Sequence, residues 1–151
     1  MTLNGVLIVT NAGSEIQPKL TVLTRLSLVI QGDLASKANS RKLVTFKGKP
    51  RFIKSDKARD WERSALLQIP LDHRIGMTGP IIMTATIYYA SRRPDLDPSL
   101  LMDVLEHAGV YKNDRQIIEQ HLIKKLDPVN PRVELLLEEL RAELGQHPKS
   151  P

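Results

Sequence analysis

The sequence predicts a single α+β domain in which a mixed, mostly antiparallel sheet is packed by two principal helices. Three observations predict this fold class. The length of 151 residues suits one domain with an ordinary core. Several short segments alternate apolar and polar residues, and two segments between chain breakers show helical spacing of apolar residues. We divide the chain into an N-terminal arm or extra strand (1–23), the domain (24–140) and a tail expected to be disordered (141–151).

The first half of the domain is predicted to hold a strand and a helix separated by a polar segment. Residues 25–30 alternate with period two, which predicts a half-buried strand. Residues 34–50 are rich in Ser, Asn, Lys and Gly and indicate a loop with one weak strand. Residues 57–69 have helical spacing, and either Ser55 or Asp56 is suited to cap this helix.

The second half is predicted to hold the centre of the sheet and the second helix. Residues 81–90 are β-branched and aromatic without a charge, which predicts a central strand. Asp97 is expected at the N-cap of the next helix, with Pro98 at its first position and Gly109 closing it. Its predicted buried stripe is Leu100, Leu101, Val104, Leu105 and Ala108. Two further strands are expected at about 116–124 and 133–137.

Positive charge is concentrated in one segment of the chain. The net charge is +5, and between Lys37 and Arg59 Asp56 is the only acidic residue. Such a segment is typical of a surface that binds a polyanion, although a solvated loop is the ordinary alternative. The expected DNA-binding residues are Lys37, Arg41, Lys42, Lys47, Lys49, Arg51, Lys54 and Lys57, together with Lys124 near the end of a later strand.

The composition also excludes several kinds of site. The chain has no cysteine, so disulfides, thiolate zinc sites and cysteine nucleophiles are excluded. Its longest apolar runs are far too short for a spanning helix, and no basic region precedes an apolar one near the start. We therefore expect a cytoplasmic protein without a membrane partner.

Three carboxylates stand out because the chain is otherwise basic. Asp95 and Asp97 precede the second helix, and Asp114 follows it. Hard cations such as Mg²⁺ prefer carboxylate and phosphate oxygens, so the pattern indicates metal-assisted phosphodiester chemistry. Residues two apart in extended chain point to one side, and a hairpin-like return is expected to bring Asp114 to the same edge. Taken singly, the three residues also suit a solvated strand end, a helix cap and a turn.

The stretch 92–124 resembles a known family. Arg92-Arg93-Pro94-Asp95-Leu96-Asp97, the helix ending in His107-Ala108-Gly109, and the run from Lys112-Asn113-Asp114 to Lys124 are similar to the RusA family of Holliday junction resolvases. The resemblance extends over about residues 24–138. It implies a RusA-like fold and a homodimeric, Mg²⁺-dependent endonuclease, often phage-encoded, that nicks four-way DNA junctions symmetrically. It further implies that Asp95, Asp97 and Asp114 are the catalytic metal ligands.

Two departures from the family pattern concern catalysis. Pro98 replaces the usual Asn after the second Asp, and Leu101 stands where the family has a catalytic lysine. Loss of a cation near the scissile phosphate normally costs rate. Lys112, Arg115 or Lys124 is available to replace it, and Lys112 is favoured because it lies on the same turn as Asp114. The shorter helix also makes Asp103 a candidate fourth carboxylate.

The departures leave a second function open. A protein of the same fold that binds branched DNA but cleaves weakly or not at all fits the missing lysine, whereas retention of three aspartates favours catalysis. A small RNA-binding or ribosome-associated domain leaves those aspartates unexplained. We expect the nuclease, with a second copy of the chain as partner, because paired symmetric cuts require two symmetric active sites.

Overall fold

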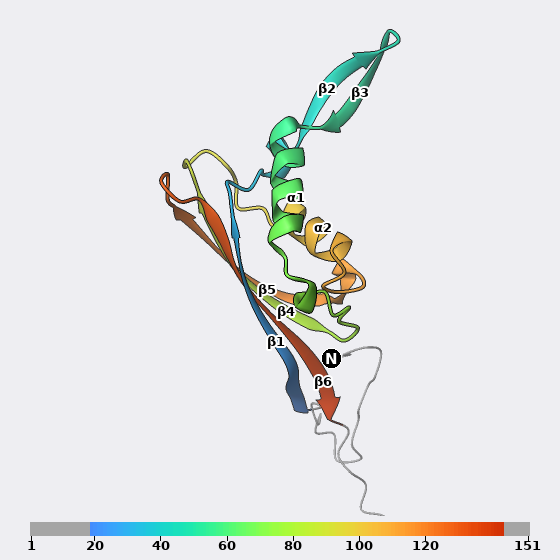
Figure 1. Ribbon diagram of the computed structural model, residues 1–151, viewed down its shortest axis with the longest axis vertical. Coiled ribbons are helices and arrows are strands. Elements are labelled where there is room, and N and C mark those ends of the chain that lie inside the picture. Colours follow the sequence, from blue (N-terminus) through green and yellow to red (C-terminus); the bar gives the residue numbers. More distant parts are fainter. Residues whose placement is uncertain (1–18, 144–151) are drawn as a thin grey trace, which may run out of the picture.

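The computed structural model describes residues 19–143 (Figure 1). That part of the chain forms six strands, two α-helices and three short 3-10 helices. The strands are β1 Lys19–Gln31, β2 Arg41–Phe46, β3 Lys49–Lys54, β4 Ile81–Tyr89, β5 Ile117–Leu126 and β6 Arg132–Glu143. The α-helices are α1 Asp56–Gln68 and α2 Ser99–His107, and the 3-10 helices are η1 Lys37–Asn39, η2 Leu71–His73 and η3 Asp114–Gln116.

Four strands form the main sheet, in the order β1, β6, β4, β5. β6 is antiparallel to both of its neighbours, whereas β4 and β5 are parallel. A parallel pair requires a crossover connection, and α2 supplies it between β4 and β5. Both helices lie on one side of this sheet (Figure 1). The predicted α+β domain, with a mixed and mostly antiparallel sheet and two principal helices, is confirmed.

The core lies between the sheet and the helices. β4 is an inner strand, as predicted, and alternate residues along it are fully buried: Ile81, Met83, Ala85, Ile87 and Tyr89. The helix α2 buries the predicted stripe, Leu100, Leu101, Val104, Leu105 and Ala108. Burial of this many large apolar side chains is the main favourable term in folding such a domain.

The helix α1 begins where the sequence predicts. Ser55 has extended backbone, and its hydroxyl oxygen accepts a hydrogen bond from the Ala58 N–H at 3.2 Å. This is the bond that an N-cap residue supplies to the first helical turn, so Ser55 is the cap rather than Asp56. Trp61 and Ala65 turn towards the core. Neither α-helix within residues 19–143 has the length and apolar content that crossing a membrane requires.

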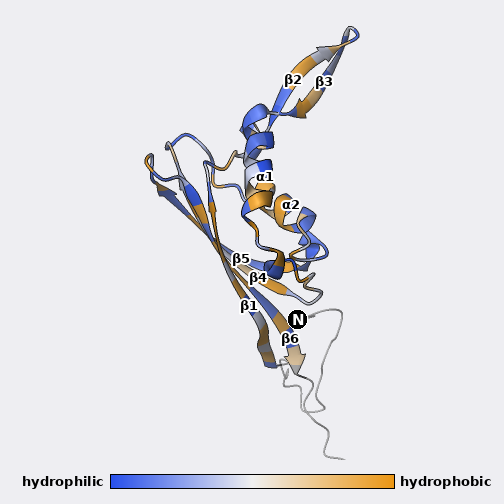
Figure 2. Cartoon of the chain, in the orientation of Figure 1, coloured by the Kyte–Doolittle hydropathy of each residue, from blue (hydrophilic) through white to orange (hydrophobic). Residues whose placement is uncertain are grey.

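The basic segment differs from its prediction. Residues 41–54 form the two-stranded β2–β3 hairpin instead of a loop with one weak strand. Its turn residues Lys47 and Gly48 have φ angles of 49° and 76°, as in the tight turns that suit twisted hairpins. Apolar residues appear along both strands of this hairpin (Figure 2), and they stand on both of its faces. The one-sided alternation that predicts a half-buried strand is therefore missing.

The outer strands extend beyond their predicted limits. β1 begins at Lys19, so the boundary expected between residues 23 and 24 falls inside it. β6 continues to Glu143, past the predicted end at residue 137. The rest of the expected arm and tail, 1–18 and 144–151, lies outside the described residues.

A buried acid explains why the β6 extension was missed. Glu139 is only 7% exposed, and its carboxylate accepts hydrogen bonds from the Thr78 and Gly79 N–H groups, both at 2.9 Å. These bonds satisfy a charge that is costly to bury alone. They also fix the segment that leads into β4.

Candidate active site

The N-terminal end of α2 is organised around Asp97. One carboxylate oxygen accepts hydrogen bonds from the Ser99 N–H at 2.9 Å and the Ser99 hydroxyl at 2.6 Å, and the other accepts the Lys37 N–H at 2.6 Å. The structural N-cap position is Pro98, one residue later than predicted. Asp97 still binds the start of the helix through its side chain, in the manner of an Asx turn.

The surroundings of Asp97 keep it ionised. Partial burial raises its pKa, but the hydrogen bonds from Ser99 and from the Lys37 main chain, with the positive charge of Lys37, outweigh burial and leave the pKa below its usual value. An ionised carboxylate whose orientation is set by three hydrogen bonds is well suited to bind a cation.

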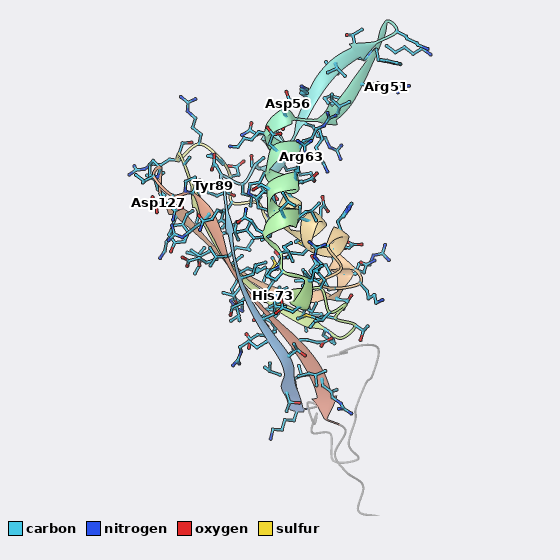
Figure 3. The ribbon with its side chains drawn as sticks, in the orientation of Figure 1. Arg51, Asp56, Arg63, His73, Tyr89 and Asp127 are labelled. Atoms are coloured by element: carbon cyan, nitrogen blue, oxygen red, sulfur yellow. The ribbon has the colours of Figure 1, made fainter. Side chains whose placement is uncertain are left out.

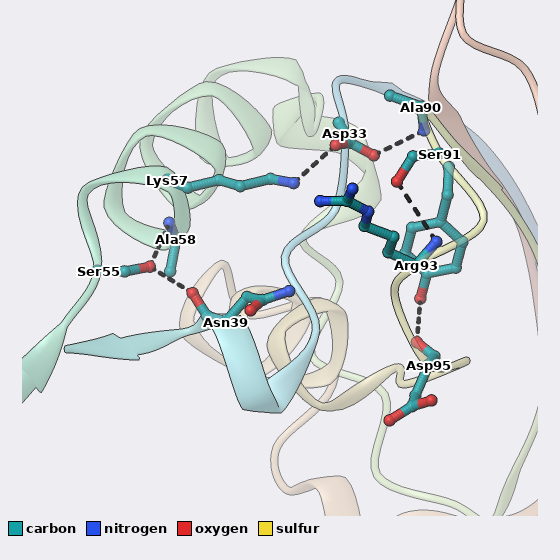
Figure 4. A network of polar contacts seen from close by, with 10 residues as sticks. Asp33, Asn39, Ser55, Lys57, Ala58, Ala90, Ser91, Arg93 and Asp95 are labelled. Carbon is teal, nitrogen blue, oxygen red and sulfur yellow. Dashed lines mark hydrogen bonds and ion pairs between the residues drawn. The ribbon is translucent and has the colours of Figure 1, made fainter.

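A buried tyrosine positions the loop that carries Asp95. The Tyr89 hydroxyl donates to the Asp95 carbonyl at 3.0 Å and accepts the Asp97 N–H at 3.3 Å. Burial raises the pKa of this phenol, so it remains a neutral donor. Asp95 is exposed, and in Figure 4 its carboxylate extends away from the contacts that hold the loop.

Lys124 holds the same loop from the neighbouring strand. Its ammonium group donates to the Arg92 carbonyl at 3.2 Å and to the Pro94 carbonyl, and it lies 5.8 Å from the centre of the Tyr89 ring. We predicted a DNA-binding role for Lys124. The contacts it makes here are with the backbone immediately before Asp95.

Asp33 joins the loop to α1 (Figure 4). Its carboxylate accepts the Ala90 N–H at 3.0 Å and pairs with the Lys57 ammonium at 2.6 Å. Sequence reasoning missed Asp33, Tyr89 and Ser99. Asp33 and Tyr89 act through main-chain atoms or elements distant in sequence, whereas Ser99 lies two residues from Asp97. Only the Asp97-Pro98-Ser99 spacing, which is typical of an Asx turn, carried a local signal.

Asp114 lies at the other end of α2. Its N–H donates to the Glu106 carboxylate at 3.4 Å, and it begins η3, whose Asn113 cap accepts the Arg115 N–H at 2.9 Å. The nine residues of α2 separate its two ends by about 12 Å. Among residues 19–143, no group of three acidic or histidine side chains is placed to share a metal ion.

The predicted convergence of Asp95, Asp97 and Asp114 within one chain is therefore wrong. The prediction assumed a hairpin-like return. Because β4 and β5 are parallel, α2 instead carries the chain back along the length of β4, and Ile117 pairs with Ile81 at the start of that strand. Asp114 precedes Ile117 and so lies at the opposite end from Asp95.

Of the candidate replacement cations, Lys112 and Arg115 lie at the C-terminal end of α2, whereas Lys124 contacts the loop before Asp95. Lys112 accompanies Asp114: its N–H donates to the Met77 carbonyl at 3.2 Å, beside Gly76. Leu101, at the position of the family lysine, is fully buried in the core. The cation whose charge acts on Asp97 is Lys37. Asp103 lies on the exposed side of α2, between the two ends.

A cleft of about 400 Å³ opens between the base of the hairpin and the start of α2, and two of its lining residues, Lys37 and Ser99, donate hydrogen bonds to Asp97. Lys37, Arg41 and Lys54 line one side of it, and Ser99 and Asp103 line the other. Its positive side chains suit a phosphate group. The cleft thus places an anion-binding surface next to the ionised Asp97.

Six of the nine predicted DNA-binding residues lie on the hairpin, and Figure 3 shows Arg51 out along it. Towards its base, Lys42 pairs with Asp56 at 2.8 Å, and Lys54 pairs with Glu62. Lys47, Lys49 and Arg51 lie towards its tip. Cations held by acidic neighbours contribute less to phosphate binding than unpaired ones, so the tip is the stronger anion-binding part.

The family profile described as endodeoxyribonuclease RusA matches residues 33–138. The match includes the hairpin, both helices, the two parallel strands and all three aspartates. No curated protein sequence matches the chain significantly. Because the matched region exceeds half of the 151 residues, this chain belongs to the RusA endodeoxyribonuclease family.

Proposed function

We propose that this chain is a Mg²⁺-dependent endonuclease that resolves four-way DNA junctions by paired, symmetric nicks. The observation that carries the proposal is the pairing of Asp97, held ionised at the start of α2, with a cleft lined by Lys37, Arg41 and Lys54. A metal-binding carboxylate and a phosphate-binding surface side by side are what phosphodiester hydrolysis requires. Membership of an endodeoxyribonuclease family supports the same reaction class.

The donors present fit a hard divalent cation. Mg²⁺ is usually held by one or two carboxylates together with substrate phosphate oxygens and water. Asp95 and Asp97 provide two carboxylates on one loop. The Asp97 oxygen that accepts only the Lys37 N–H retains a lone pair, whereas the other oxygen already accepts two hydrogen bonds from Ser99. When bound, the ion supplies an activated water and neutralises charge on the departing oxygen. Lys37 and Arg41 orient the phosphate beside it.

Two copies of the chain are needed for the whole set of residues to act together. Asp114 and Lys112 lie at the far end of α2 from Asp97, so one chain does not gather them around one ion. We propose that a two-fold dimer apposes the N-terminal end of one α2 with the C-terminal end of the other, so that Asp114 and Lys112 act on the site of the partner subunit. Two symmetric sites also suit two symmetric cuts.

One observation favours the second candidate, a protein of this fold that binds branched DNA but cleaves it weakly. Leu101 is fully buried, so the family's lysine position presents no cation to the substrate. The loss of such a group costs about 10²- to 10³-fold in rate. Junction binding, in contrast, depends on the hairpin and the cleft.

A synthetic four-way junction with labelled strands tests both candidates. We expect nicks at symmetric positions in two opposite strands with Mg²⁺ and none with EDTA, and no cutting of a linear duplex of the same sequence. Binding of the junction without nicks at any Mg²⁺ concentration would establish the second candidate. Equal cutting of the linear duplex would contradict structure selectivity.

A further inference from the structure

The β2–β3 hairpin, residues 41–54, exposes large apolar side chains on both of its faces. Leu43 is directly opposite Phe52 across the two strands, so these two side chains share one face. Phe46 is opposite Lys49, and its position along β2 places it on the other face. The exposed fractions are 61% for Leu43, 73% for Phe52 and 55% for Phe46.

Folding does not account for this exposure. The hairpin is a separate two-stranded sheet that projects from the body of the molecule (Figures 1 and 2). An isolated two-stranded hairpin is marginally stable, and aromatic side chains that face solvent on both sides add nothing to a core. A binding partner that covers both faces is the simplest use for them.

The charges around the aromatic rings define the chemistry of that partner. The Lys47 ammonium lies 5.6 Å and the Arg51 guanidinium 5.5 Å from the centre of the Phe46 ring. On the other face, Arg41 and Lys54 are paired across the strands next to Leu43 and Phe52. No acidic residue occurs from Lys37 to Lys54. The partner must therefore carry negative charge together with flat apolar faces.

Nucleic acid with unstacked bases has both properties. Aromatic side chains within a positive surface are the usual platform on which bases stack. A continuous duplex presents its phosphates but keeps its base faces covered, whereas the centre of a four-way junction is where stacking is interrupted. The hairpin also borders the cleft beside Asp97 through Arg41, Phe52 and Lys54. A strand held along the hairpin thus leads towards the candidate active site.

We propose that the hairpin enters the centre of the junction, where Phe46 and Phe52 stack on bases exposed at the branch point and Lys47, Lys49 and Arg51 bind the adjoining phosphates. This inference rests on the proposed junction-binding function. It assigns the choice of branched over linear DNA to two aromatic side chains on opposite faces of one hairpin.

The test measures binding and base unstacking in EDTA, where no cleavage occurs. The probe is a four-way junction with 2-aminopurine at the branch point, whose fluorescence rises when the base leaves its stack. The variants are Phe46→Ala, Phe52→Ala and Phe46→Leu, with Thr45→Ala as an exposed control on the same strand. We expect each alanine replacement to weaken junction binding about 5- to 100-fold and to reduce the fluorescence rise, with duplex binding unchanged.

The conservative variant separates stacking from general apolar contact. Phe46→Leu keeps apolar volume but removes the aromatic face, so it should resemble Phe46→Ala, while Thr45→Ala behaves as wild type. Wild-type affinity and fluorescence in Phe46→Ala and Phe52→Ala would overturn the inference. So would loss of the dimer in Phe46→Ala by analytical ultracentrifugation, because the hairpin would then contact protein. If the wild-type protein does not prefer the junction to the duplex, the proposed function itself fails.

Discussion

The two ends of α2 carry similar residues in different surroundings. At the N-terminal end, Asp97 accepts hydrogen bonds from Ser99 and from the main-chain N–H of Lys37. The buried Tyr89 fixes the loop before it. At the C-terminal end, Asp114 contacts Glu106 through its N–H, and acidic side chains gather: burial and then Asp114, Glu106 and Asp103 all raise the pKa of Tyr111.

This difference shows what each end requires from outside. The N-terminal end is organised before any ligand arrives, because its hydrogen bonds come from the chain itself. The C-terminal end carries Asp103, Glu106 and Asp114 around Tyr111, with Lys112 and Arg115 next to Asp114 in the chain. In the dimer that we propose, the two ends of α2 supply complementary halves of one site, which gives a physical reason for two copies to meet.

The largest expected effect comes from removing the carboxylate at either end. Asp97→Asn keeps an oxygen that accepts a hydrogen bond from Ser99 but loses the negative charge that we propose binds the metal. We expect Mg²⁺-dependent nicking to fall by at least about 10³-fold, with junction binding unchanged or tighter because a negative charge near the phosphates is lost. Paired cleavage and gel-shift measurements test this. Unchanged cleavage would show that Asp97 only stabilises the start of α2.

Mixing two inactive variants tests whether the two ends act across the dimer. If Asp97 of one copy works with Asp114 of the other, a heterodimer of Asp97→Asn and Asp114→Asn contains one intact site and one doubly altered site. Random exchange of subunits should then restore about a quarter of the wild-type sites, each giving a single nick. If both residues act within one chain, every site carries a substitution and mixing restores nothing.

The cation at each end provides the next largest effect. Lys112→Ala should lower the single-turnover nicking rate by about 10²- to 10³-fold with little change in junction affinity, if Lys112 stabilises charge in the transition state. Lys37→Ala is the matched change at the opposite end and should mainly weaken binding of the phosphate in the cleft. Weaker junction binding with normal nicking at saturating protein in Lys112→Ala would make Lys112 a docking residue. It would also shift the catalytic role to Arg115 or Lys124, or favour the weakly cleaving alternative.

The β2–β3 hairpin borders the cleft at the N-terminal end of α2. Changes there should have a smaller effect on DNA binding, and this effect should depend on salt. Replacing Lys47, Lys49 and Lys54 together with Ala should weaken binding of all DNA sequences and flatten the slope of log K against log salt by about two to three units. The lower value applies if Glu62 keeps Lys54 from the phosphates. Lys19→Ala, at the start of β1, is the control for a general change in charge. An unaltered slope would leave the hairpin outside the DNA contact.

The smallest effect concerns the hydroxyl of Ser99. Hydrogen bonds from Ser99 lower the pKa of Asp97, so Ser99→Ala should raise that pKa. A carboxylate with a depressed folded-state pKa contributes stability above its ordinary pKa near 3.9 and loses it as pH falls. Because the pKa of Asp97 rises in Ser99→Ala, the acid limb of the nicking rate plotted against pH should also move to higher pH. The rate at about pH 8 should stay close to that of the wild type. A profile that does not move would show that the Ser99 main chain suffices.

Much of the local structure followed from the sequence because its causes are local. Ser55 caps α1, Gly109 with its φ of 80° closes α2, and the β-branched run at 81–90 forms an inner strand. Each depends on a few neighbouring residues and on the choice between apolar and polar positions. The hairpin was missed because its apolar side chains face both ways.

The family, and the residue types of the candidate site, could also be predicted from the sequence. The spacing of the aspartates and lysines along the chain was sufficient for this. Their arrangement was not. Whether Asp114 returns to Asp95 depends on β5 pairing parallel to β4, and that choice is made by contacts between residues far apart in the chain. The pleated pattern of a strand is the same for either direction, so only the assembled sheet decides whether Asp114 lies at the same end of β4 as Asp95.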